Sequence, residues 1–336
     1  MHEKTSERVT AVIPVYRARF FAGCLASVFA QTRRPDHVIV VDDGSPEGAA
    51  IERAVLRYGE GVTLIRQGNR GAGAARNCGI LASNSELTAF LDADDEWAPT
   101  FLQEQLDRMR VGDVSAVYAN GDIVGDSPLR GMRFMDTAPS EGTVTVDSLL
   151  SQRCTVLTSS VVARRKMLLD VGLFDEELRR GQDFDLWVRL AAAGAAFAYT
   201  TAPLVKRRIH TQNLSGDRIS ELERALDVLV KLRAKGVLTA AHCDVLDARV
   251  RALRAQIATE QGKKTLLAGD LPEARWHFGQ AVTEGGGWKP LVVRLALQVA
   301  PTMTRHAYLF KMRRHAGPAS DRRAGAGSRS GTAIRA

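Results

Sequence analysis

AFLDADDEWAP (residues 89–99) places three aspartates, Asp92, Asp94 and Asp95, directly after an apolar run that is predicted to form a buried strand. Like charges at one strand end repel each other, and each carboxylate resists losing its water unless a positive charge lies nearby. The stretch therefore makes two predictions about the fold. The strand belongs to a buried sheet, and the end of that strand needs a cation.

Strand and helix patterns alternate up to about residue 110. The predicted strands, rich in Val, Ile and Leu, are VTAVIPVY (9–16), HVIVVDDG (37–44), VTLIRQ (62–67) and LTAFLDA (87–93). Helical patterns lie between them, over 20–31, 47–59 and 71–83. Such alternation indicates an α/β fold with a mostly parallel central sheet that is covered on both faces. Because ligands of these sheets bind at the carboxyl ends of the strands, the acids of VVDDGS and FLDADD are expected to converge on one edge.

The pattern changes along the rest of the chain. Strands are predicted at 114–124, 158–164, 196–201 and 204–210, a loop over the site at 125–145 and a helix at 183–193. From Glu221 on, apolar residues recur at helical spacing. The expected parts are an α/β domain (1–218), a helical region (219–288), a basic amphipathic helix (289–314) and a disordered basic tail (315–336). The helical region faintly resembles one tetratricopeptide unit, and an ordinary helical bundle is the alternative.

Charge and cysteine content set limits on partners and compartment. The net charge is +8, but residues 289–336 alone carry +9, so the body is near neutral and no nucleic-acid partner is predicted. The four cysteines form no CxxC pair, and no stretch approaches the roughly 18 apolar residues of a membrane span. The charged start, MHEKTSERVTAVIPVY, lacks the apolar region of a signal peptide. These features predict a cytoplasmic protein, with segment 289–314 either peripheral on the inner face of the plasma membrane or docked on the bundle.

The acids of the opening stretch suit a divalent metal ion. Asp92 and Asp94 supply hard oxygen ligands, which Mg²⁺ and Mn²⁺ prefer, and Mg²⁺ in proteins is commonly completed by phosphate oxygens. A metal diphosphate would therefore allow the three acids to coexist. The alternative is an Asx-turn or a helix cap ahead of EWAPTFLQEQL, in which Asp95 or Glu96 would serve.

Five motifs follow one another over about residues 8–215: VIPVY, VVDDGS, GNRGAGAARNCGI, FLDADD and GQDFDLWVRL. Together they resemble a family 2 glycosyltransferase of the GT-A fold. The resemblance implies a Rossmann-like nucleotide-diphosphosugar transferase domain that uses Mg²⁺ or Mn²⁺ and inverts the anomeric carbon. It also implies a nucleotide-diphosphosugar donor, with UDP the commonest carrier, and a glycan, lipid-linked glycan or polysaccharide acceptor.

The resemblance also assigns residues to the donor site. Those implied to contact the nucleotide sugar are Pro14, Val15, Tyr16, Asp42, Asp43, Asn69, Arg76, Asn77, Asp92 and Asp95. The implied metal ligands are Asp94, Asp92 and His210, the last from RRIHTQNLSG. For Asp42 and Asp43 the alternative is a cap for the helix after Gly44. The glycines of GNRGAG allow close backbone approach at a helix start, where a diphosphate is favoured.

An inverting displacement also needs a base for the acceptor hydroxyl. In GQDFDLW, Asp183 matches the acid that closes the family's E-D motif, and Gln182 replaces the usual Glu. Asp185 is a second candidate, but it matches an acid that is structural in the family. The alternative for Asp183 is a helix N-cap.

Two other interpretations compete with this one. A nucleotidyltransferase would carry a Gly-rich basic loop after the first strand, and PVYRARFFAG lacks it. A non-catalytic nucleotide-sugar-binding or helical scaffold protein would have no need to keep Asp94 and Asp183 together. Metal-dependent release of nucleoside diphosphate from a donor separates the scaffold from the enzyme.

Overall fold

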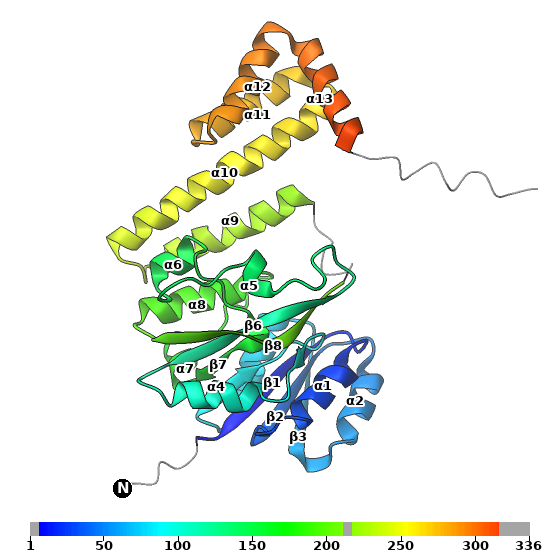
Figure 1. Ribbon diagram of the computed structural model, residues 1–336, viewed down its shortest axis with the longest axis vertical. Helices are drawn as coiled ribbons and strands as arrows, with labels where there is room; N and C mark the ends of the chain where they lie inside the picture. The colour runs from blue at the N-terminus through cyan, green and yellow to red at the C-terminus, as the bar shows by residue number, and fades with distance from the viewer. Residues whose placement is uncertain (1–6, 211–216, 316–336) are drawn as a thin grey trace, which may run out of the picture. The chain divides into compact units, whose positions relative to one another are not determined.

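The computed structural model describes residues 7–210 and 217–315, and its contacts divide the chain into two compact units, Met1–Val250 and Arg251–Ala336. The first unit holds the sheet, and the second is helical (Figure 1). The predicted borders at 218, 288 and 314 stay predictions. The tail beyond residue 315 and part of RRIHTQNLSG lie outside the described residues.

One eight-stranded sheet organises the first unit, in the order β3-β2-β1-β4-β7-β6-β8-β5. The strands are β1 (Val9–Val15), β2 (His37–Asp43), β3 (Val62–Gln67), β4 (Leu87–Phe90), β5 (Glu96–Trp97), β6 (Ala116–Gly125), β7 (Val162–Arg164) and β8 (Phe197–Ile209). The first four strands are parallel, and β8 runs parallel to β6. Strand β7 is antiparallel to β4 and β6, and β5 is antiparallel to β8. The predicted α/β fold with a mostly parallel sheet is confirmed.

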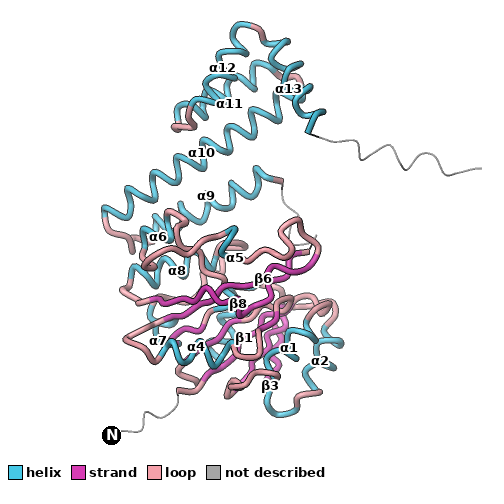
Figure 2. The backbone as a smooth tube through the Cα atoms, in the orientation of Figure 1, coloured by secondary structure: helices cyan, strands magenta, loops and turns pink. Residues whose placement is uncertain are grey.

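Helices connect the strands and cover the sheet, as the tube view also shows (Figure 2). The helices of the sheet region are α1 (Phe21–Phe29), α2 (Gly48–Leu56), α3 (Ala72–Ala82), α4 (Phe101–Met109), α5 (Phe134–Thr137), α6 (Val146–Leu150), α7 (Arg165–Asp170) and α8 (Gln182–Ala192). Helices α9 (Arg218–Ala234) and the start of α10 (Ala240–Ala268) belong to the same unit by their contacts. The long helical pattern after residue 220 therefore contributes to both units.

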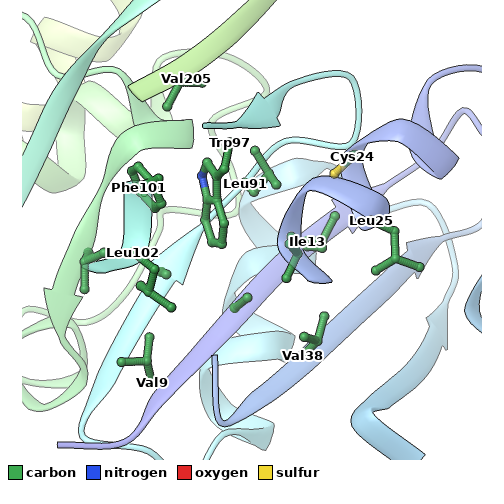
Figure 3. Close-up of a cluster of buried hydrophobic side chains, with 14 of the residues drawn as sticks. Val9, Ile13, Cys24, Leu25, Val38, Leu91, Trp97, Phe101, Leu102 and Val205 are labelled. Carbon is green, nitrogen blue, oxygen red and sulfur yellow. The ribbon is translucent and has the colours of Figure 1, made fainter. Parts of the chain in front are cut away.

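Alternation along β2 shows why both faces of the sheet are covered. Val38 and Val40 join the main core with Ile13, Cys24 and Leu25, as Figure 3 shows for four of these five side chains. Ile39 and Val41 point the opposite way and pack with Ala75 of α3. A strand that is apolar at every position must be buried on both faces, which is what its near-continuous Val/Ile run predicts.

Three local predictions differ from the structure. The predicted loop 125–145 contains the short helix α5, and the predicted strand 158–164 begins with a 3-10 turn, η2 (Thr158–Ser160). The two predicted final strands form one strand, β8, whose pairing with β6 shifts register around Asn120. A register shift lets a strand bend and continue, so AFAYTT and LVKRRIH are not separated by a turn.

The second unit packs α11 (Leu271–Thr283) and α12 (Trp288–Val299) around a small core of Leu266, Ala274, Phe278 and Leu297. A further helix, α13 (Pro301–His315), follows directly. The segment 289–314, predicted as a single helix, therefore forms two helices. Pro301 lacks the N–H that would continue α12, and it is well placed in the first turn of the next helix.

Candidate active site

A cavity of about 770 Å³ opens at the carboxyl ends of β1, β2 and β4. We call it the first cavity. Its lining comes from the end of β1 and the following loop, the end of β2, the start of α3, the loop after β4 and the residue after β8; the residues are Pro14, Val15, Tyr16, Arg17, Arg19, Phe20, Asp43, Ala72, Arg76, Asp92, Ala93, Asp94 and His210. Eight of these were predicted as site residues. The acids of two strands meet at one sheet edge because β2 and β4 flank β1 in parallel.

Positive charge and aromatic surface come from the loop after β1. The guanidinium of Arg17 lies over the ring of Tyr16, and that of Arg19 lies over the ring of Phe20. The Phe20 ring also lies 5.8 Å from the His210 ring. Cation–π contacts of this kind help to hold arginine side chains at a cavity wall, and Arg17 also pairs with Glu47 at 3.8 Å. Sequence reasoning missed Arg17, Arg19 and Phe20, although RARF directly after the first strand carries two arginines next to an aromatic residue.

Asp43 organises the loop that leads into α3. Its Oδ1 accepts hydrogen bonds from the backbone N–H of Arg70 and the side chain of Gln67, and its Oδ2 accepts one from Gly71 N–H, each at 2.8 Å. The turn after β2 comes close to the same loop, since a Cβ on Gly44 (φ +70°) would lie 2.7 Å from Asn69 N. Only glycine fits there. Asp43 thus lines the first cavity and also fixes the loop directly before Ala72, another lining residue.

Arg76 compensates the first acid of FLDADD. Its Nη2 lies 2.5 Å from Asp92 Oδ1, and its guanidinium lies over the ring of Phe174. Arg76 is only 5% exposed, and its Nε has no hydrogen-bond partner among the described residues. A buried guanidinium beside an acid at a cavity wall can attract a second anion as well. The positive charge that the acid cluster requires is therefore supplied in part by the protein itself.

Asp94 faces His210, the residue that directly follows β8. Asp94 Oδ2 lies 3.3 Å from His210 Nε2, and both residues line the first cavity. Carboxylate and imidazole donors suit Mn²⁺ and, for the oxygens, Mg²⁺, so the donor chemistry fits a divalent ion. Within residues 7–210 and 217–315, no three His, Cys, Asp or Glu side chains are grouped tightly enough to hold an ion. Asp92 is turned towards Arg76 instead.

Asp95 takes part in the support of the acid loop. Its Oδ2 accepts a hydrogen bond of 2.6 Å from Ser159 Oγ, and its Oδ1 accepts one of 2.7 Å from Arg208 N–H. Burial, and then the neighbouring Asp94 and Asp92, raise the pKa of Asp95 well above its usual range. The Ser159 hydroxyl also accepts from Asp92 N–H. Turn η2 thus anchors the loop, a role that its sequence TSS does not reveal.

Several predicted site residues lie outside the lining of the first cavity. Asp42 is buried and accepts from Ser45 N–H, Asn69 is exposed, and Asn77 is buried with its amide paired to the backbone of Phe174. Asp95 is buried as described above. The turn interpretation accounts for the hydrogen bonds of Asp42. The partner of Asn77 lies almost a hundred residues away in the chain. The local sequence Arg76-Asn77 therefore does not reveal whether Asn77 binds a ligand or supports the fold.

The predicted base and its neighbour lie in different surroundings. Asp183 lies in the first turn of α8, accepts from Thr158 Oγ1 at 3.0 Å, and lines a second cavity rather than the first. Asp185 is fully buried, pairs with Arg189 at 2.7 Å and receives Lys235 Nζ at 2.8 Å. Arg189 in turn donates to the carbonyls of Val171 and Leu173. Asp185 is therefore held by a structural ion-pair network, and Asp183 is the acid that is open to a cavity.

The sheet order and the first cavity define a GT-A domain. Residues 10–172 match the family described as Glycosyl transferase family 2, so the domain that carries the first cavity is a glycosyltransferase domain of this type. WfgD of Escherichia coli, named a UDP-Glc:alpha-D-GlcNAc-diphosphoundecaprenol beta-1,3-glucosyltransferase, is 27% identical over 66% of this chain and 85% of its own. Against curated uncharacterized glycosyltransferases of Rickettsia, the chain spans between 30% and 70% of the relative's length.

Two solved structures extend the likeness beyond the family domain. TarS of S. aureus (residues 1–349) matches with a TM-score of 0.58 at 15% identity, covering 92% of both chains. The mannosyltransferase PcManGT of Pyrobaculum calidifontis, solved with GDP-Man and Mn²⁺, matches with a TM-score of 0.59 at 20% identity, covering 91% of this chain and 86% of its own. At such identities these matches establish the fold alone.

Proposed function

We propose that the protein is an inverting glycosyltransferase that moves a sugar from a nucleotide-diphosphosugar to a hydroxyl of a glycan, lipid-linked glycan or polysaccharide acceptor. One observation carries the proposal: a single cavity at the strand ends brings together Asp43, Arg76, Asp92, Asp94 and His210. The similar proteins support it, since WfgD is named for UDP-Glc and a lipid diphosphate acceptor, and PcManGT was solved with GDP-Man. UDP is the proposed carrier.

The proposed reaction combines these groups with Asp183, which lines the second cavity. Asp183 accepts the proton of the acceptor hydroxyl while that oxygen forms its bond to C1 of the donor sugar. The bond between C1 and the diphosphate oxygen breaks, and its electron pair leaves with the nucleoside diphosphate. Arg76 places a positive charge at the wall of the cavity in which the diphosphate would sit. A divalent ion held by Asp94 and His210, with Asp92 as a third ligand once it turns away from Arg76, would add Lewis-acid stabilisation of the leaving group.

A thermal-shift screen tests the donor. UDP, GDP and dTDP and their sugars are added to the full chain with and without Mn²⁺, and release of nucleoside diphosphate is then measured. Saturating ligand at about a hundred times its Kd stabilises the folded state by roughly 2.7 kcal/mol, which raises Tm by several degrees. If no nucleotide shifts Tm and no donor turns over, the scaffold interpretation replaces this one.

Asp94→Asn tests the metal. We expect the variant to lose the Mn²⁺-dependent part of UDP affinity by about tenfold or more, because one of the hard charged ligands becomes a neutral amide. Titration calorimetry of UDP with and without Mn²⁺ measures it. Asp122→Asn, which removes the same charge from an exposed position on β6, is the control. Equal Mn²⁺ dependence in Asp94→Asn and wild type would contradict the assignment.

We further propose that the second unit rests on an anionic membrane surface. Trp288, Leu291, Val292, Leu295 and Val299 are all exposed, and their spacing places them on one face of α12. The opposite face, with Pro290 and Leu297, is buried in the unit. Lys289 and Arg294 flank the exposed face, an arrangement typical of helices that lie in a lipid interface. None of the helices in the described residues is long and apolar enough to span a bilayer.

The double substitution Leu291→Glu and Leu295→Glu tests this surface. We expect binding to vesicles containing anionic lipid to fall by on the order of tenfold or more, because two apolar side chains no longer enter the lipid and two negative charges are added. Cosedimentation with such vesicles measures it. Leu56→Glu with Leu81→Glu changes two exposed leucines of the first unit and serves as the control. Undiminished cosedimentation would refute the membrane proposal.

A further inference from the structure

A third cavity, of about 430 Å³, lies in the second unit where α11 meets α12. Its walls carry two guanidinium groups, an indole, an amide and a hydroxyl; the residues are Arg275, Trp276, Gly279, Gln280, Thr283 and Arg294. Arg294 comes from α12 and the others from α11. The cavity lies outside residues 10–172, which match the family. The glycosyltransferase domain therefore assigns it no role.

Both arginines of the third cavity lack a counter-charge. Neither Arg275 nor Arg294 makes an ion pair or a side-chain hydrogen bond within the described part of the chain. Glu273, the acid in the first turn of α11, lies 3.3 Å from His277 instead, and neither of these two lines the cavity. Residues 251–315 hold eleven Lys and Arg against four Asp and Glu, so the unit cannot pair its own cations. Two guanidinium groups at one cavity repel each other and favour a bound anion.

Gly279 makes room for one of these guanidinium groups. It lies inside α11, where glycine is among the least favourable residues, and its backbone is not in the left-handed region that requires glycine. A Cβ at this position would lie 3.7 Å from Arg294 Nε. The missing side chain thus leaves open surface across which Arg294 reaches from α12. The position of this guanidinium is set by the packing of the two helices.

The groups around the cavity suit the phosphate of a phospholipid. Guanidinium groups bind phosphate oxygens through paired N–H donors, and Gln280 and Thr283 add a neutral amide and a hydroxyl. Trp276 is 57% exposed. An indole has an apolar body and one N–H donor, and it is typical of the headgroup level of a membrane. Free phosphate would leave this ring without a partner.

The third cavity borders the exposed apolar face of α12. Arg294 lies three residues after Leu291 and directly before Leu295, and residues three apart are neighbours on a helix surface. We propose that the third cavity binds the phosphate of an anionic glycerophospholipid whose acyl chains lie against this face. The inference rests on the proposal above that the second unit lies on an anionic membrane. It adds one discrete lipid site to an attraction that is otherwise spread over a basic surface.

Titration of the full chain with dihexanoyl phosphatidylglycerol, kept below its micelle concentration, tests the site. NMR follows the indole N–H signal of Trp276, which is identified by its loss in Trp276→Phe. Arg275→Gln with Arg294→Gln should weaken binding by about tenfold or more, because two charge-assisted hydrogen bonds are lost. Arg251→Gln with Arg254→Gln removes the same charge from exposed positions of α10 in the same unit and should leave binding within about twofold of wild type.

The melting temperature of each variant verifies that it is folded, and all four arginines are replaced without loss of an ion pair in the described residues. Absence of binding to the wild type, or equal weakening by the two pairs of substitutions, overturns the proposal. Inorganic phosphate is titrated in the same way. If it binds as tightly as the short-chain lipid, the cavity takes free phosphate and the lipid assignment is wrong.

Cosedimentation with phosphatidylglycerol vesicles separates this site from the membrane proposal. We expect the Arg275 and Arg294 pair of substitutions to lower vesicle binding more than the control pair does. Vesicle binding that both pairs lower equally would leave the membrane surface standing and refute the discrete site. Binding of the soluble lipid without binding of vesicles would refute the membrane proposal and leave the site standing.

Discussion

Asp183→Asn lowers the rate of sugar transfer by about a thousandfold, the middle of the range for loss of a general base, while UDP affinity stays within about twofold of wild type. The amide cannot take up the proton of the acceptor hydroxyl. Donor binding is spared because Asp183 lines the second cavity and not the first. Transfer rates with saturating donor, together with calorimetric titration of UDP, give the two quantities.

The fold of the variant is expected to be intact. An asparagine can still accept the hydrogen bond from Thr158 Oγ1 through its carbonyl oxygen. Asp170→Asn, which removes an equal charge from an exposed position of α7, is the control and should transfer sugar at the wild-type rate. Wild-type turnover by Asp183→Asn would exclude this residue as the base and leave the donor cavity unaffected.

Asp185→Ala destabilises the protein by about 3–5 kcal/mol, the typical result of removing one partner of a buried ion pair. Asp185 is fully buried between Arg189 and Lys235, so its loss leaves a buried guanidinium without a counter-charge. The expected change in Tm is a fall of about 10 °C for a unit of this size. Thermal and urea unfolding measure it.

The control for this substitution is Asp170→Ala, which breaks an exposed pair with Lys166 on the neighbouring helix turn. Such surface pairs contribute about 0–1 kcal/mol, so the control should melt close to wild type. If Asp185→Ala is as stable as the control, the ion pairs of Asp185 do not contribute the expected 3–5 kcal/mol to the free energy of unfolding. The pair of substitutions at 183 and 185 thus separates an acid needed for chemistry from one needed for folding, two residues apart.

Much of the fold follows from local patterns. The Val/Ile runs of β1 and β2 and the apolar spacing of α1 predict a covered parallel sheet, because burial on two faces requires apolar residues at every strand position. The strand predicted at 158–164 was wrong at its start, because the conformation there depends on contacts with distant residues. TSS at 158–160 has no strong preference, and it turns in η2 because its hydroxyls find partners in Asp183, Asp95 and Ala119.

The candidate site was predictable as a place but not as a set of contacts. Acids after β2 and β4 had to meet once those strands flanked β1, and Asp43, Asp92 and Asp94 do line one cavity. Asn77 matched the same motifs, yet its amide is taken up by Phe174. Arg17 and Arg19 line the cavity without belonging to any of the motifs that predicted it.

By itself the sequence determined the family, the strand and helix periodicity and the edge at which charge collects, because these depend on residue types within a short window. Only the tertiary structure decided which carboxylates face a cavity and which are engaged in hydrogen bonds or ion pairs within the protein. Asp95 is bound by Arg208 and Ser159, and Asp185 by Lys235, partners between about 50 and 113 residues away. The protonation and availability of a carboxylate depend on what lies within a few ångströms, and chain distance carries no information about that.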